Sequence, residues 1–405
     1  MLEYHKKGEI PALTGLRGAA ALLVVISHYW HWTALTPVAG LPELTARWLL
    51  STSAVGMAIF FTLSGYVIAL NYAAWDWGNR PAFNLVRLFF YRFARLYPAF
   101  LVFAILCILR WPALHDLSDW NVQSYVLPHL LLWQTWWPVK FGGALASDDY
   151  FHVSWSLSVE CGLYLAFALA AVVLAAFPSS RRKPLVAGVA MSLFAVALLH
   201  VVWLARSAIK PDDWTESDLA KWFFLISPYG VSLQFGTGVA AYFLGRRLRS
   251  PQIARFASEA GFLGLVVVYA ASCLTSDTSA FLQSLLMSLV TGLILVGCRA
   301  GSFANQLLSG RAIVYVGTIS YSVYLFHFIT PPLGVHAIFF KDYTDTAALY
   351  HGVNFLAALA LTLFFAAGVY VMVEVPGRRG IRAAADRILG IRPRQLKVET
   401  GAPAE

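Results

Sequence analysis

Apolar runs of about 20 residues recur along the whole chain, and short polar stretches separate them. A helix of that length matches the hydrocarbon thickness of a bilayer, where its backbone groups can pair only with one another. The composition agrees, because 59% of the 405 residues are hydrophobic and 13% are charged, against roughly a quarter charged in soluble domains. The pattern excludes a water-soluble protein and predicts an all-α, polytopic membrane protein.

Ten of these runs are predicted to span the membrane. They are residues 11–33, 48–72, 95–112, 155–177, 185–205, 222–244, 258–275, 281–298, 312–335 and 349–373. An eleventh run, residues 122–138, contains His129, Gln134 and two prolines. If this run does not span, every cluster of Lys and Arg falls on one side of the membrane, as the positive-inside rule requires. We therefore predict ten spans with both termini cytoplasmic, and place residues 122–138 along or partly within the outer membrane surface.

The predicted membrane domain covers residues 1–376, and residues 377–405 form a basic cytoplasmic tail suited to anionic lipid. The net charge of +9 does not indicate a nucleic-acid partner, because Lys and Arg concentrate in the predicted cytoplasmic loops. The four cysteines lie far apart, without a CxxC pair or a Cys/His spacing. We therefore predict neither a disulfide framework nor a metal site.

Ionisable side chains inside a membrane span are costly and are therefore functional candidates. Arg17 and His28 lie on nearly one face of the first predicted helix, about 16 Å apart along its axis. Counting residues from the predicted helix ends places Glu160 and His327 in the outer third of the membrane with His28. This outer group offers imidazole and carboxylate side chains for proton transfer.

A second polar group is predicted nearer the cytoplasm. It comprises Arg17, Ser64, Gly65, Arg92 and Arg95. Arginine forks suit the recognition of phosphate groups, so this group fits a phosphorylated donor that enters from the cytosol. Two ordinary alternatives stay open: positive-inside bias for Arg92 and Arg95, and helix packing for the small pair Ser64 and Gly65.

Six segments occur in an order that resembles the acyltransferase 3 family of integral membrane acyltransferases. They are TGLRG (residues 14–18) followed by His28, FFTLSGY (60–66), RFARLYP (92–98), WSLSVE (155–160), SYSVYLFH (320–327) and EVP (374–376). The WSLSVE segment matches the family pattern without change, whereas Tyr66 replaces the commoner Phe and Tyr91 stands where a basic residue often occurs. Relatives that acetylate peptidoglycan commonly carry an extracellular hydrolase-like domain after the membrane part, and this subgroup is not expected here.

The resemblance implies transfer of an acyl group, most often acetyl, from acyl-CoA to a hydroxyl group, without a metal, in the bacterial inner membrane. His28 is the predicted general base, and Glu160 is predicted to orient it or relay its proton. The predicted acyl-CoA-binding residues are Arg17, Ser64, Gly65, Arg92 and Arg95. Trp155, Tyr324 and His327 are predicted to bind the acceptor, which is a carbohydrate, a lipid-linked sugar or a small molecule.

Each of these roles has a structural alternative. His28 could instead be a histidine at the membrane interface. Glu160 could be a structural partner for an arginine or a tyrosine, and His327 could be a hydrogen-bonded histidine inside the helix bundle. The other histidines considered, His129 and His152 among them, are predicted to be interfacial or loop residues. At the level of the whole protein the main alternative is a transporter or flippase, which predicts discontinuous helices or repeated halves. Neither feature is visible in the sequence.

Overall fold

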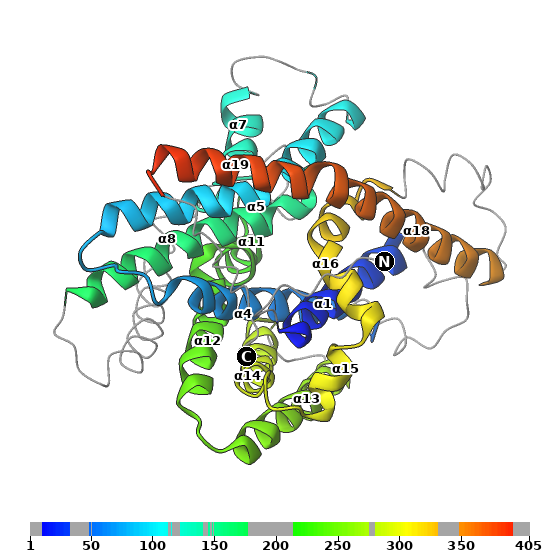
Figure 1. Ribbon diagram of the computed structural model, residues 1–405. Helices are drawn as coiled ribbons and strands as arrows, with labels where there is room; N and C mark the ends of the chain where they lie inside the picture. Colours follow the sequence, from blue (N-terminus) through cyan, green and yellow to red (C-terminus); the bar gives the residue numbers. More distant parts are fainter. Residues whose placement is uncertain are drawn as a thin grey trace, which may run out of the picture.

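The computed structural model describes residues 10–32, 48, 49, 51–111, 115, 122–140, 145, 148, 150–176, 214–274, 280–330 and 348–391. Within these residues the chain forms helices and connecting turns, with no strand (Figure 1). Six helical stretches are long and apolar enough to cross a membrane. They are Pro11–Tyr29, Ser51–Tyr72, Pro81–Arg110, His152–Ala175, Pro251–Leu274 and Phe355–Ile388. The prediction of an all-α membrane protein is confirmed.

All but one of the predicted spans fall on described helices. These are α1 (Pro11–Trp32), α4 (Thr52–Tyr72), α5 (Pro81–Arg110), α8 (Trp155–Ala175), α12 (Pro228–Arg247), α13 (Pro251–Leu274), α14 (Ala280–Val296), α16 (Arg311–Phe326) and α18 (Ala348–Val369). The remaining predicted span, residues 185–205, lies outside the described residues. The number of crossings and the side on which the termini lie stay predictions. Within the described residues, no disulfide bond joins Cys107, Cys161, Cys273 or Cys298.

Helix α5 begins at Pro81, well before the start predicted at residue 95. Proline is favoured in the first turn of a helix because the N–H group that it lacks has no intrahelical partner there. The predicted span of residues 95–112 placed Arg92 and Arg95 at the start of their helix, which was wrong. In the structure, the Arg92 guanidinium lies over the rings of Tyr72 and Tyr164, at 5.1 and 4.9 Å. Arg92 and Arg95 therefore lie in the middle of a long helix.

Close crossings among α1, α4, α12 and α16 form the centre of the bundle (Figure 1). A Cβ atom on Gly238 of α12 would lie 1.8 Å from the Thr62 carbonyl oxygen of α4. In return, a Cβ atom on Gly65 of α4 would lie 2.0 Å from the Phe235 carbonyl oxygen of α12. Small residues permit such backbone contact between membrane helices. The crossings hold the faces of α1 and α4 that carry Arg17 and Ser64 toward one interior.

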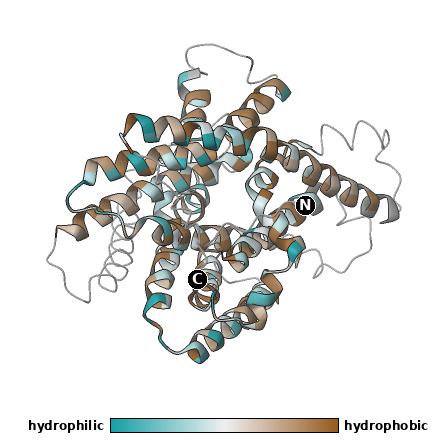
Figure 2. Cartoon of the chain, viewed as in Figure 1, coloured by the Kyte–Doolittle hydropathy of each residue, from teal (hydrophilic) through white to brown (hydrophobic). Residues whose placement is uncertain are grey.

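Helix α18 continues through the short π-helix η5 (Tyr370–Glu374) into α19 (Val375–Ile388). Figure 2 shows that α18 is mostly hydrophobic, whereas the turn between α12 and α13 is hydrophilic. Helix α19 runs beside α5 (Figure 1), and the Tyr91 hydroxyl of α5 donates to Asp386 at 2.6 Å. The predicted basic tail thus begins as a helix packed on α5, while residues 392–405 lie outside the described part.

Residues 122–140 contain no helix long enough to cross a membrane. They form the short π-helix η2 (Val122–Val126), the short helix α7 (Leu127–Leu130) and a series of turns. The Thr135 hydroxyl lies 2.8 Å from that of Ser158 on α8, and the Trp136 indole N–H donates to the Ser158 carbonyl at 3.0 Å. Irregular backbone at membrane depth needs such protein partners. In the structure, hydrogen bonds to Ser158 therefore hold this segment against α8.

Candidate active site

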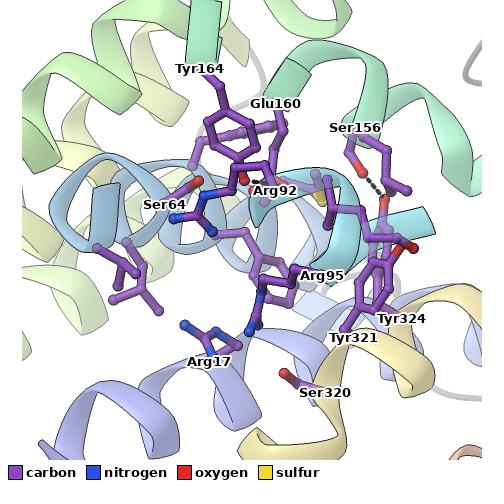
Figure 3. A pocket seen from close by; sticks show the side chains of 17 residues that line it. Arg17, Ser64, Arg92, Arg95, Ser156, Glu160, Tyr164, Ser320, Tyr321 and Tyr324 are labelled. Carbon is purple, nitrogen blue, oxygen red and sulfur yellow. Dashed lines mark hydrogen bonds between the residues drawn. The ribbon is translucent and has the colours of Figure 1, made fainter. Parts of the chain in front are cut away.

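A cavity of about 90 Å³ lies among α1, α4, α5, α8 and α16. Figure 3 shows the side chains of Arg17, Arg92 and Arg95 directed into it from α1 and α5. The cavity is also lined by polar residues of α4, α8 and α16, namely Ser64, Ser156, Glu160, Tyr164, Ser320, Tyr321 and Tyr324. The structure thus brings together four of the five residues predicted to bind the donor.

The cavity carries an excess of positive charge. Three guanidinium groups face one carboxylate, Glu160, and the charges of Arg92, Arg95 and Glu160 all act on Arg17. Arg92 is only 8% exposed, and its Nε has no hydrogen-bond partner. Within the described part of the chain, none of the three arginines forms a hydrogen bond or a salt bridge. Because unpaired charge in a protein interior is costly, the geometry fits a site for an anionic group.

Glu160 lies with the arginines rather than with His28. Its Oε2 accepts a hydrogen bond from the Tyr164 hydroxyl at 2.7 Å, one turn further along α8. Separating Glu160 from the arginines was wrong, because the sequence prediction put Arg92 and Arg95 at the start of their helix, whereas α5 begins at Pro81 and carries both into the cavity beside Glu160. Among the described residues Glu160 has no hydrogen bond to His28. Its catalytic role stays a prediction.

His28 and His327 form a pair between α1 and the end of α16. Their Nδ1 and Nε2 atoms are 2.8 Å apart, and the planes of the two rings are almost parallel, with the ring centroids 5.1 Å apart. His327 is fully buried, and its Nδ1 lies 2.6 Å from the carbonyl oxygen of Tyr324. The ring of His152 lies edge-on to that of His28 at 5.4 Å. Sequence reasoning missed His152, although it stands just before the WSLSVE segment.

Tyr324 connects the cavity with the histidine pair. Its side chain lines the cavity, where Ser156 donates to the Tyr324 hydroxyl at 2.8 Å and that hydroxyl donates to the Val153 carbonyl at 3.1 Å. The main-chain carbonyl of the same residue accepts from His327. One residue therefore borders the cationic cavity and holds the imidazole that contacts His28.

The remaining predicted residues lie around the cavity without lining it. Trp155 is half-buried and packs against Phe61 at a ring distance of 5.9 Å. Gly65 contacts the backbone of α12, which is the packing alternative considered for it. Sequence reasoning did not single out Tyr164 or Tyr321, which donates to the Leu96 carbonyl at 2.6 Å. The helical spacing of Tyr164 from Glu160 was the available signal for the first of them.

Comparison with known proteins agrees with this geometry. A family model described as an acyltransferase domain, of the acyltransferase 3 type, matches residues 10–374. The chain is 25% identical to the putative membrane-bound transacylase BcsY of Komagataeibacter xylinus, over 93% of this chain and 84% of that protein. It is 27% identical to the acyltransferase MdmB of Streptomyces mycarofaciens, over 91% of this chain and 92% of that protein.

A further relative is the peptidoglycan O-acetyltransferase OatA of Listeria monocytogenes, which is 22% identical over 80% of this chain. The chain spans only about half of that protein, since 50% of OatA is covered. No solved structure matches the chain. The family match over nearly the whole sequence, together with the apolar helices, shows that this chain belongs to the acyltransferase 3 family and is an integral membrane acyltransferase.

Proposed function

We propose that the protein is a bacterial inner-membrane O-acyltransferase with ten spans and cytoplasmic termini. It transfers an acetyl group from cytosolic acetyl-CoA to a hydroxyl group of a carbohydrate acceptor near the extracytoplasmic face. The observation that carries this proposal is the cationic cavity, which Tyr324 joins to the pair of His28 and His327. The name of OatA, a peptidoglycan O-acetyltransferase, supports an acetyl group and a polymer acceptor, and that of BcsY, a putative membrane-bound transacylase, supports acyl transfer.

The arginines are the proposed binding groups for the phosphates of the donor. A guanidinium forms two parallel hydrogen bonds to a phosphate, and such charged bonds are stronger than neutral ones. Arg92 has little solvent around it, so an anion is the natural partner for its buried Nε. Ser64, Glu160 and Tyr164 line the same space and can hydrogen bond to the neutral part of the donor.

Activation of the acceptor is the task of the histidine pair. A thioester carries a good leaving group, so the enzyme chiefly needs a base for the hydroxyl and correct placement of both partners. His28 takes the hydroxyl proton as the acceptor oxygen bonds to the thioester carbonyl carbon. The carbon–sulfur bond then breaks, and the departing thiolate receives that proton from His28. The products are an ester and free coenzyme A, and His28 returns to its neutral form.

The proposal is tested in sealed inside-out membrane vesicles, which present the cytoplasmic face to the medium. Radiolabelled acetyl-CoA is added, and label is measured in the carbohydrate and lipid fractions, with vesicles from cells carrying an empty vector as control. We expect label in a carbohydrate fraction only when the protein is present. Equal label in the two preparations, or label confined to the lipid fraction, would contradict the proposed acceptor or the transfer itself.

The donor site predicts a specific kinetic change. Replacing Arg92 by methionine is expected to raise KM for acetyl-CoA about 100-fold, because one charged contact to phosphate is worth about 2–3 kcal/mol. S-acetylpantetheine, which lacks the phosphates, is expected to be an equally poor donor for both proteins. The exposed Arg249 supplies the matched control, since Arg249→Met removes a positive charge away from the cavity. An unchanged KM in Arg92→Met would place the phosphates elsewhere.

A further inference from the structure

The hydrogen bonds around His327 determine which of its nitrogens carries a proton. A carbonyl oxygen only accepts hydrogen bonds, so the short contact between His327 Nδ1 and the Tyr324 carbonyl, at 2.6 Å, requires a proton on Nδ1. In a neutral imidazole the other nitrogen is then an acceptor. His327 is fully buried, which favours the neutral form. His327 Nε2 is therefore an acceptor directed at His28.

The same reasoning extends to His28. Its Nδ1 lies 2.8 Å from His327 Nε2, and because that atom accepts, His28 Nδ1 must donate. In neutral His28 the proton is then on Nδ1, and Nε2 carries the lone pair. The chain of donors and acceptors thus runs in one direction, from His28 through His327 to the main chain of α16.

We propose that His327 is a positioning residue that holds His28 in the Nδ1-protonated form, so that His28 Nε2 is the atom that takes the acceptor proton. This inference rests on the proposed function. It gives His327 a role different from binding the acceptor, and it assigns to a neutral histidine the orienting role that the sequence suggested for Glu160. The carboxylate of Glu160 is engaged by Tyr164 and faces the arginines.

The arrangement also stabilises the charge that develops on His28. When Nε2 takes a proton, the bond from His28 Nδ1 to His327 becomes charge-assisted and strengthens. His327 cannot rotate away without breaking its own bond to the Tyr324 carbonyl and its contact with His28 Nδ1. His327 Nε2 is a hydrogen-bond acceptor that is already in position before the reaction begins, so it does not have to reorganise as positive charge appears on His28. Because His327 is neutral, unlike a carboxylate in the same place, the site holds no unbalanced buried charge while His28 is neutral.

Two variants separate this role from simple packing. His327→Phe keeps a ring of similar shape but removes both nitrogens, and it is expected to lower kcat about 100-fold with KM for acetyl-CoA within about twofold. His327→Gln keeps one donor for the Tyr324 carbonyl and one acceptor for His28. It is expected to retain activity within about fivefold of the unaltered protein. His115→Gln, at an exposed histidine, is the control.

A spectroscopic measurement tests which nitrogen of His28 carries the proton, and it needs no acyl-acceptor substrate. The protein is labelled with ¹⁵N-histidine in detergent micelles, and the His28 signals are identified by their loss in His28→Gln. The chemical shifts are expected to show a protonated Nδ1 and an unprotonated Nε2 in the unaltered protein, and a mixture of both forms in His327→Phe. This readout moves with the tautomer, whereas a purely structural role for His327 would leave it unchanged.

The outcomes distinguish this inference from the proposed function. If His28→Gln is inactive while folded His327→Phe keeps full kcat, the positioning role of His327 is overturned, whereas the role of His28 as general base is retained. A proton on His28 Nε2 in the unaltered protein overturns it as well. If both variants keep full activity, His28 is not the base and the proposed mechanism fails with it. A loss of kcat in His327→Phe, together with nearly normal kcat in His327→Gln, supports the positioning role of His327.

Discussion

Replacing His28 by glutamine is expected to lower kcat about 1,000-fold while KM for acetyl-CoA stays within about twofold. Glutamine is close in size and keeps a polar end near His327, but it cannot take a proton at neutral pH. General-base catalysis contributes roughly 10²–10⁴-fold, and the proposed donor site is built from other residues. The initial rate of label transfer in inside-out vesicles, divided by the amount of folded protein, measures the effect.

The control for this experiment must show that the variant still folds. Size-exclusion chromatography in detergent gives the folded amount, and His115→Gln gives the effect of losing a histidine that is exposed. Activity of His28→Gln within tenfold of the unaltered protein would assign the base to another group. The ring of His152, 5.4 Å from that of His28, would then be the first residue to test.

Replacing Gly238 by leucine is expected to abolish folded protein. The Cβ atom alone would lie 1.8 Å from the Thr62 carbonyl oxygen and 2.8 Å from the Tyr66 nitrogen, so α4 and α12 could not keep their crossing. Both neighbours are main-chain atoms, which cannot move aside as a flexible side chain does. Overpacking of a close contact costs about 3 kcal/mol or more, a large share of total stability. The yield of monodisperse protein in detergent is the measurement.

Gly380 provides the matched control for this substitution. It lies within α19, and an added Cβ atom would meet nothing within 4 Å, so Gly380→Leu is expected to give a normal yield. Gly238→Ala adds the same Cβ atom and is therefore also expected to lower the yield of folded protein strongly. Normal yield of Gly238→Leu would mean that the crossing of α4 and α12 tolerates separation and that the shape of the cavity does not depend on it.

The sequence predicted the helices well because apolar length is a property of each segment by itself. Most predicted spans overlap their helices closely, as for α4 and α14. The start of α5 was missed because the cost of placing Arg92 in the membrane depends on the rings of Tyr72 and Tyr164, which come from other helices. A residue that is too polar for lipid can be buried comfortably in protein.

The candidate site was predictable in its residues more than in its contacts. Arg17, Arg92 and Arg95 were recognised as one group, and they do converge on the cavity. The contact of His28 with His327 joins residues 299 positions apart, and it depends on how α1 and α16 cross. No spacing within one helix reveals such a crossing. For the same reason the partner of Glu160, and the position of Tyr324 between cavity and histidines, required the structure.

The pairing of the first helix with a late one has a consequence for biosynthesis. His28 is made 299 residues before His327, and Gly317 of α16, which packs against Thr14 of α1, is likewise made long after α1. Until α16 is inserted, Arg17 and His28 on α1 lack the helix that completes their surroundings. A nascent chain that stops before α16 therefore carries the arginines of the cavity but lacks the histidine pair.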